Sequence, residues 1–242
     1  MTMRNLLIFA AFLFFAGSAL AVEEFSEVNG VKLSVKDEGK GQPMILLHGR
    51  GYSKEYMAGL FDRFKGKYHV FSYDSRGHGK SDKPEAFTLD DDADDLAGLV
   101  EAYGMEKPVV VGFSMGSYIT LRAAEKYPGL FSKIVLIGTR GRGDRYADED
   151  ISQMSPNDAA ILRALIGFDN MTDIKKADIP ALVITGENDR INPVPEGRKV
   201  AEALPDAEFH VIPKAEHVAF MKPDELEQVC SLIDEFMTRR RK

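Results

Sequence analysis

The stretch "VVVGFSMGSYIT", residues 109–120, is the part of the sequence that decides the fold. A continuously apolar run, typical of a strand buried on both faces, ends at Ser114 and passes into a helical pattern. Gly112 and Gly116 stand two positions before and after this serine. A sharp strand-to-helix turn strains the serine backbone, and the two glycines remove side chains that would collide there. We therefore expect the Ser114 hydroxyl to stand above a sheet as a candidate nucleophile.

The rest of the chain repeats this pattern of apolar runs separated by helical segments. Residues 24–39 alternate about Asn29-Gly30, the strongest short signal for a hairpin. Further apolar runs cover 43–49, 68–74, 133–139, 180–186 and 208–213, and helical patterns cover 53–64, 89–104, 115–128 and 224–240. An opening hairpin followed by strand–helix alternation predicts an α/β fold: a mostly parallel eight-stranded sheet with helices on both faces.

Two polar side chains follow later strands and suit the chemistry of an activated serine. A serine hydroxyl needs an imidazole to take its proton, and the imidazole needs a carboxylate to orient it. Asp189 follows the run 180–186, and His217 follows the run 208–213. Catalytic groups in such sheets lie beyond the carboxyl ends of the strands, and the chain order Ser, Asp, His fits this architecture. Glu187 is the second candidate for the acid.

On these residues the chain resembles the α/β-hydrolase superfamily, in its serine-nucleophile, esterase-like branch, over residues 24–238. The segment "HGRG", 48–51, is similar to the oxyanion loop of that family, and "DSRGHGKSD", 74–82, to a structural turn. The resemblance implies that the backbone N–H groups of Arg50 and Met115 form the oxyanion hole. It implies acyl transfer on a small-molecule acyl substrate, an ester, thioester, lactone or amide, with neither a cofactor nor a metal.

Residues 139–179 differ from the large helical insertion common in this family, and we call them the cap segment. They predict only two short helices, near 155–166 and 172–176, so we expect a minimal cap and a small or accessible acyl group. Arg140, Arg142 and Arg145 lie here, and Arg50 lies on the oxyanion loop. Attraction of an anionic substrate is one interpretation. Pairing with Asp144, Asp148 and Glu149 is the one we favour.

The first 21 residues predict a secretory signal peptide. Arg4 precedes an apolar run of about 11 residues, too short for a membrane anchor, and Ala19 and Ala21 form an A-x-A cleavage pattern. We expect cleavage after Ala21, a single domain over 22–242, a periplasmic or secreted location, and no stable membrane span after cleavage. An uncleaved N-terminal anchor is the alternative.

Charge and cysteine content narrow the function classes. The net charge is −7, or −8 without Arg4, so the sequence does not indicate a nucleic-acid partner. The single cysteine, Cys230, allows no internal disulfide and no Cys/His metal cluster. The acids at 90–95 lack the spacing of a calcium loop, and we interpret them as a solvated helix start. The oligomeric state stays open.

Two function classes follow from these expectations. The first is an exported serine hydrolase that works through an acyl-enzyme on Ser114. The second is a ligand-binding protein, or a lyase, that uses the same pocket without acyl-enzyme turnover. A complete Ser-His-Asp set favours the first, because a pure binder has no physical need for all three groups.

Overall fold

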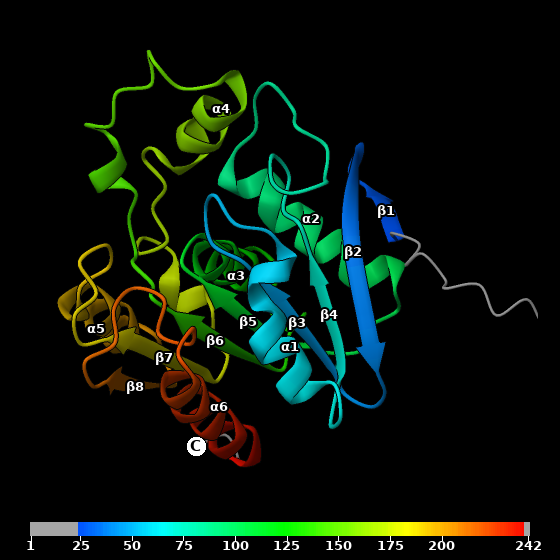
Figure 1. The fold of residues 1–242 in the computed structure, drawn as a ribbon, viewed down its shortest axis with the longest axis vertical. Coiled ribbons are helices and arrows are strands. Elements are labelled where there is room, and N and C mark those ends of the chain that lie inside the picture. Colours follow the sequence, from blue (N-terminus) through cyan, green and yellow to red (C-terminus); the bar gives the residue numbers. More distant parts are fainter. Residues whose placement is uncertain (1–23, 240–242) are drawn as a thin grey trace, which may run out of the picture.

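The computed structural model describes residues 24–239, and one eight-stranded sheet runs through it (Figure 1). The strands are β1 (Glu24–Val28), β2 (Val31–Gly39), β3 (Pro43–Leu47), β4 (His69–Tyr73), β5 (Val109–Phe113), β6 (Lys133–Ile137), β7 (Ala181–Gly186) and β8 (Ala207–Ile212). Their order is β1-β2-β4-β3-β5-β6-β7-β8. β2 pairs antiparallel with β1 and β4, and the strands from β4 onward pair parallel. The mostly parallel eight-stranded sheet expected from the sequence is confirmed.

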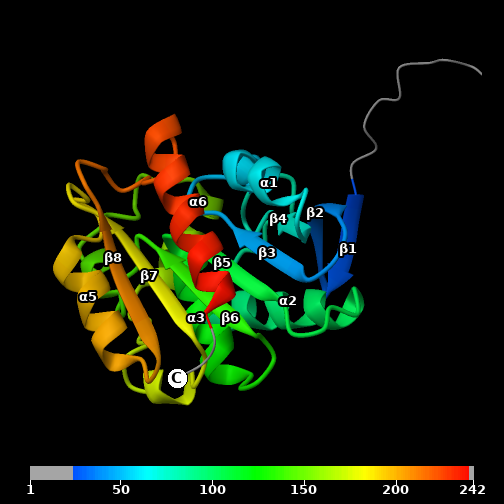
Figure 2. The same ribbon diagram turned by 90° about the horizontal axis from the view of Figure 1, so that it is seen from below.

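Helices cover both faces of this sheet, as Figure 2 shows. The longer ones are α1 (Ala58–Phe64), α2 (Leu89–Ala102), α3 (Met115–Lys126), α5 (Val194–Ala203) and α6 (Pro223–Thr238), and a 3₁₀ turn η1 (Lys54–Met57) precedes α1. α1 and α6 pack on one face, and α2, α3 and α5 on the other. α5 was not expected from the sequence.

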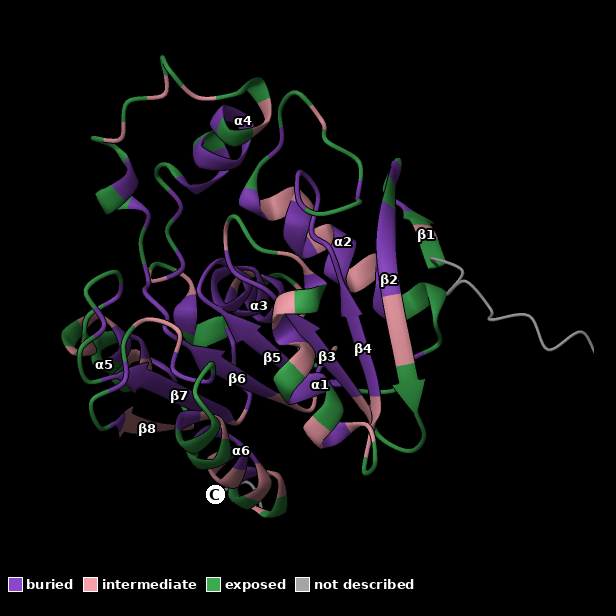
Figure 3. Ribbon diagram, viewed as in Figure 1, coloured by how far each residue is buried: buried purple, intermediate pink, exposed green. Residues whose placement is uncertain are grey.

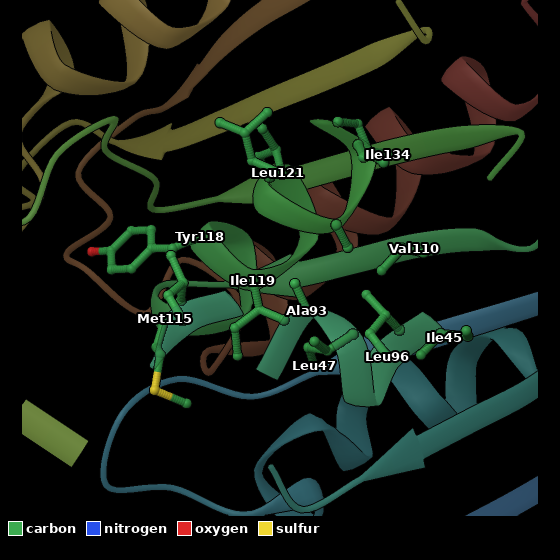
Figure 4. Close-up of a cluster of buried hydrophobic side chains, with 14 of the residues drawn as sticks. Ile45, Leu47, Ala93, Leu96, Val110, Met115, Tyr118, Ile119, Leu121 and Ile134 are labelled. Carbon is green, nitrogen blue, oxygen red and sulfur yellow. The ribbon is translucent and has the colours of Figure 1, made fainter. Parts of the chain in front are cut away.

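Two apolar layers fill the space between the sheet and the helices. The central strands are buried along their whole length, as the colouring of Figure 3 shows. Figure 4 shows the layer beneath α2 and α3, where Leu96 and Ile119 pack against Leu47 and Val110 of the strands. Burial on both faces explains why these strands have continuous apolar sequences. The core therefore holds rigid the strand ends from which the candidate site is built.

The cap segment contains two 3₁₀ turns, η2 (Asp144–Tyr146) and η3 (Ile174–Lys176), and one helix, α4 (Pro156–Leu165). α4 and η3 correspond to the two short helices expected there. A short antiparallel contact closes the segment at its base, where the N–H of Asn170 donates to the carbonyl of Gly141 and that of Gly143 to Phe168. Figure 1 shows α4 standing away from the sheet.

The acidic cluster at 90–95 corrects one expectation. Only part of it is a solvated helix start: Asp91 completes a capping box with Thr88. Asp92 and Asp95 are buried, at 3% and 1% exposure. Arg76 donates two hydrogen bonds of 2.7 Å to Asp95, so this acid serves to fix the turn after β4 against α2. The sequence pattern missed this because the partner is 19 residues away.

The predicted signal peptide, residues 1–21, lies outside the described residues. Within residues 24–239, no helix is both long enough and apolar enough to cross a membrane.

Candidate active site

Ser114 lies at the turn from β5 into α3 and has a strained backbone, with φ 50° and ψ −117°. A β-carbon on Gly112 would come within 2.3 Å of the carbonyl oxygen of Gly116. One on Gly116 would come within 2.6 Å of the carbonyl oxygen of Leu47. Both distances are far below van der Waals contact, so only glycine fits at either position. The turn thus has the tight geometry that the sequence predicts, and it presents the Ser114 hydroxyl at the end of the sheet.

The structure brings the three predicted residues together. The Ser114 hydroxyl donates to Nε2 of His217, with 2.9 Å between Oγ and Nε2. Nδ1–H of the same imidazole donates to Oδ2 of Asp189 at 2.7 Å. An imidazole that donates through Nδ1 to a carboxylate has its lone pair on Nε2, facing the hydroxyl. This arrangement can take a proton from Ser114 and hold the resulting imidazolium.

Backbone donors fix the candidate acid, Asp189, from its other side. Its Oδ1 accepts from the N–H groups of Ile191 and Asn192, each at 2.8 Å, and the residue is 3% exposed. Glu187, the second candidate for the acid, instead accepts from the N–H of Lys214 at 2.7 Å. Glu187 therefore ties the loop after β7 to the loop after β8, and does not contact the imidazole in this arrangement.

The loop after β3 lies directly against Ser114. A β-carbon on Gly49 would be 3.2 Å from Cβ of Ser114, so the chain passes the serine in contact. Arg50 is the next residue of that loop. Met115 is the first residue of α3, where a backbone N–H has no acceptor within the helix. The two predicted oxyanion donors thus belong to the two segments that meet at Ser114.

His48 shapes this loop as a neutral imidazole. Its Nδ1–H donates to the carbonyl of Gly49 at 2.8 Å, and its Nε2 accepts from the N–H of Ser75 at 3.1 Å. Burial, with a smaller contribution from the neighbouring His78, lowers the pKa of His48 to about 4. The ring therefore stays uncharged at neutral pH and joins the loop after β3 to the loop after β4.

A second polar network, which the sequence did not predict, supports the loop after β7 that carries Asp189. The amide Nδ2 of Asn192 donates to the Tyr118 hydroxyl at 2.7 Å and to the carbonyl of Gly138 at 2.5 Å. The Tyr118 hydroxyl lies 3.2 Å from that of Tyr146 in the cap segment, and Figure 4 shows it pointing out of the apolar cluster. No sequence signal pointed to this network, because Tyr118 belongs to α3 and Asn192 to the loop after β7.

The arginines near the site are paired. Arg50 donates to both carboxylate oxygens of Glu149, at 3.0 and 3.3 Å. Arg140 lies 3.3 Å from Asp144, and Arg142 lies 3.3 Å from Asp169. Arg145 donates to the carbonyl of Ile191 at 2.6 Å. The favoured interpretation, pairing with Asp144, Asp148 and Glu149, describes Arg50 and Arg140. Arg142 pairs with Asp169 instead, and no ion pair of Asp148 is found among residues 24–239.

A hollow of about 770 Å³ opens beside the candidate base. It lies over the loops after β7 and β8, and its lining is predominantly polar: Glu187, Asn188, Asp189, Arg190, Ile191, Glu216 and His217. Over residues 24–239, no group of three His, Cys, Asp or Glu side chains has an arrangement that would hold a metal ion.

Comparisons with known proteins agree with the observed fold. A family model described as alpha/beta hydrolase fold matches residues 42–173. A 2-(acetamidomethylene)succinate hydrolase from Mesorhizobium japonicum is 25% identical over 241 residues, covering 79% of this chain and 87% of the relative.

Two solved structures are also similar. An esterase from Thermogutta terrifontis superposes with a TM-score of 0.76 and 25% identity, covering 89% of this chain and 96% of the esterase. An enol-lactonase from Burkholderia xenovorans superposes with a TM-score of 0.80 and 19% identity, covering 89% of this chain and all of the lactonase. The second likeness concerns the fold alone.

Proposed function

Because the chain belongs to the α/β-hydrolase fold family, we propose that it is an exported serine hydrolase that cleaves a small carboxylic ester. Thioesters and lactones are close chemical variants of the same substrate class. The observation that carries the proposal is the unbroken hydrogen-bond chain from Ser114 through His217 to Asp189. Chains of this kind activate a hydroxyl that is otherwise a poor nucleophile at neutral pH.

In the first half-reaction, Oγ of Ser114 attacks the acyl carbon while its proton passes to Nε2 of His217. The carbonyl oxygen becomes an oxyanion, which the N–H groups of Arg50 and Met115 stabilise; each such donor contributes about 3–4 kcal/mol. The C–O bond to the alcohol then breaks, and His217 returns the proton to the leaving oxygen. Asp189 stays ionised throughout and holds the imidazole in its orientation.

In the second half-reaction, water takes the place of the alcohol. His217 removes a proton from the water, the hydroxide adds to the acyl carbon, and the same two N–H groups stabilise the second oxyanion. The bond from the acyl carbon to Oγ breaks, and the proton on Nε2 returns to Ser114. The products are a carboxylic acid and the free enzyme, with no net change in any protein group.

The short cap segment supports a small or accessible substrate. α4 is the one helix of eight or more residues in this segment. Little structure is therefore available there to enclose a long chain, and an enclosed pocket is what buries most of a large ligand.

A fluorophosphonate probe applied to residues 22–242 tests this function, because the probe needs an activated serine but not the natural substrate. We expect labelling of the wild type and its loss in Ser114→Ala and His217→Ala. Ser132→Ala and His210→Ala are the matched controls. His210 has a side chain 40% exposed in the last strand, and both controls should label as the wild type does.

The other outcomes each have a definite meaning. A folded wild type that does not label contradicts the serine-hydrolase function and directs attention to ligand binding. Labelling that survives Ser114→Ala means that another serine is the nucleophile. Labelling without release of acid from any short ester, but with loss of cyanide from a hydroxynitrile, would place the protein with lyases, and hydrolysis of a carbon–carbon bond would place it with carbon–carbon hydrolases.

Export is tested separately. The full chain, expressed in a Gram-negative host, should appear in the periplasmic fraction, and N-terminal sequencing should begin at Val22. A protein that is found in the membrane fraction and whose N-terminal sequence begins at Met1 would instead be held by an uncleaved anchor.

A further inference from the structure

We infer that the site selects esters of flat, apolar alcohols, and that Tyr52, the solvent-exposed end of a row of four aromatic side chains beside the catalytic imidazole, makes this selection. The inference rests on the proposed function and specifies the substrate for it. We call this row the aromatic wall; its members are Tyr52, Tyr56, Phe113 and Phe220.

The aromatic wall is continuous from the oxyanion loop to the candidate base. The ring centres of Tyr52 and Tyr56 lie 3.8 Å apart and are stacked. Phe113 follows, with ring centres 6.2 Å from Tyr52 and 5.1 Å from Phe220. The Phe113 ring lies 5.1 Å from the imidazole of His217. The aromatic wall thus runs from the buried ring beside the imidazole to the ring of Tyr52.

The solvent exposure of its side chains shows where the aromatic wall meets solvent. Phe113 and Phe220 are buried, but Tyr52 is 36% exposed, and Met221, directly after Phe220, is 55% exposed. Among the described residues, few large apolar side chains are this exposed, and Tyr52, Ile191 and Met221 lie on three of the loops that carry the site. An exposed aromatic ring next to the row that reaches the imidazole offers a flat apolar face to a ligand.

The chemistry assigns the wall to the alcohol half of the substrate. In the proposed mechanism Nε2 of His217 returns its proton to the leaving oxygen, so that oxygen must lie within hydrogen-bond distance of the imidazole. The group attached to the leaving oxygen therefore starts next to the ring that Phe113 contacts. A flat apolar alcohol that extends outward from this point can stack on the exposed ring of Tyr52, whereas the hollow lined by His217 is polar and charged.

The experiment compares selectivity ratios. For the alcohol half, kcat/KM is measured for benzyl acetate and ethyl acetate; for the acyl half, for ethyl phenylacetate and ethyl acetate. We expect Tyr52→Ala to lower the benzyl-to-ethyl alcohol ratio about fivefold to tenfold, as loss of one aromatic contact would do. Tyr52→Phe retains the ring and should restore the wild-type ratio. The acyl ratio should change less than twofold.

Phe25→Ala is the matched control, because Phe25 is an equally exposed aromatic residue, 40%, on the edge strand β1. It should leave both ratios at the wild-type value. Fluorophosphonate labelling of Tyr52→Ala to the same final extent as the wild type, whatever its rate, shows that Ser114 is still activated. An unchanged alcohol ratio, or a fall in the acyl ratio instead, overturns the inference. Absence of labelling in the wild type would contradict the proposed function itself, so the two failures are distinguishable.

Discussion

At the scale of single residues, the space around Ser114 leaves no room for a β-carbon on either flanking glycine. For Gly116 the closest atoms would be the carbonyl oxygens of Leu47 and His48, at 2.6 and 2.7 Å, and both belong to backbone that cannot rotate away. The start of α3 would have to move off the loop that carries Arg50. The small side chain of alanine is therefore enough to separate the two candidate oxyanion donors.

We predict that Gly116→Ala lowers the free energy of unfolding by about 1–3 kcal/mol, the usual cost of overpacking, and abolishes fluorophosphonate labelling. Urea denaturation followed by circular dichroism measures the first effect. Gly66→Ala is the control, because a β-carbon there meets nothing within 4 Å. A Gly116→Ala protein with wild-type stability and labelling would show that the contact with β3 is dispensable.

A second prediction concerns Asp189. In Asp189→Asn the side-chain amide donates to Nδ1 of His217, which places the imidazole proton on Nε2 and leaves no lone pair facing Ser114. We expect ester hydrolysis to fall by about 10⁴ in kcat with little change in KM. Glu187→Gln, which changes the neighbouring acid that the imidazole does not contact, should retain activity within about threefold. A large loss in Glu187→Gln instead would mean that the acid was assigned wrongly.

The sequence predicts Ser114, Asp189 and His217 because each follows a strand, and parallel strands bring their carboxyl ends to one edge. The same logic does not reach Asn192 or Tyr118. Their hydrogen bond joins side chains 74 residues apart. No periodic pattern encodes such a contact, since it depends on how a helix and a loop happen to pack in three dimensions.

At the scale of elements, the cap segment contacts both the loop that carries Arg50 and the helix α3 that begins after Ser114. Tyr146 of η2 lies against the guanidinium of Arg50, 5.3 Å from the ring centre, and its hydroxyl meets that of Tyr118. Glu149 completes the contact through its two hydrogen bonds to Arg50. The segment is therefore held on one side by a charge pair and on the other by a hydroxyl pair.

We predict that Glu149→Gln accelerates hydrogen exchange of the amides of residues 144–149 about twofold to fivefold. The charge pair is half-exposed, so its contribution stays below about 1 kcal/mol. Raising the salt concentration to 0.5 M should accelerate exchange in the wild type but not in Glu149→Gln. Asp148→Asn, at an exposed neighbour with no ion pair among residues 24–239, is the control. Equal exchange in all three proteins would mean that the pair does not hold the segment.

The elements differ in how far the sequence determines them. Each strand coincides with a short apolar run or with the hairpin pattern, so the local sequence is enough to predict it. The sequence did not predict α5, because Pro193, Pro195 and Gly197 lie at its start and are typical of a loop. The structure accommodates them: Pro195 stands in the first helical turn, where a missing N–H has no consequence, and Gly197 packs where a β-carbon would meet Oγ1 of Thr185 at 2.3 Å.

At the scale of the whole molecule, the fold buries a carboxyl group whose negative charge its neighbours would offset only in part. Glu125 of α3 is 4% exposed, and Arg122 reaches it only at 3.4 Å while binding Asp90 more closely. Its other oxygen, Oε1, has no hydrogen-bond partner among the described residues. Burial raises the pKa of Glu125 to about 8, because Arg122 offsets only part of the lost hydration. The folded protein therefore holds this side chain as a neutral acid at pH 7.

This proton makes the stability of the whole fold depend on pH. Between the ordinary pKa of a glutamate, about 4.5, and the folded value, about 8, the folded state binds a proton that the unfolded state has lost. The stability that the neutral Glu125 side chain contributes is thus full below pH 4.5 and is lost as the pH rises to about 8.

Glutamine imitates the neutral acid of Glu125 and cannot ionise. We predict that the free energy of unfolding of Glu125→Gln, relative to that of the wild type, rises by on the order of 2 kcal/mol from pH 5 to pH 8.5. Urea unfolding at both pH values measures the difference, and Glu202→Gln, on the exposed side of α5, should show none. Parallel curves for Glu125→Gln and the wild type would mean that Glu125 ionises in the folded protein as it does in the unfolded chain.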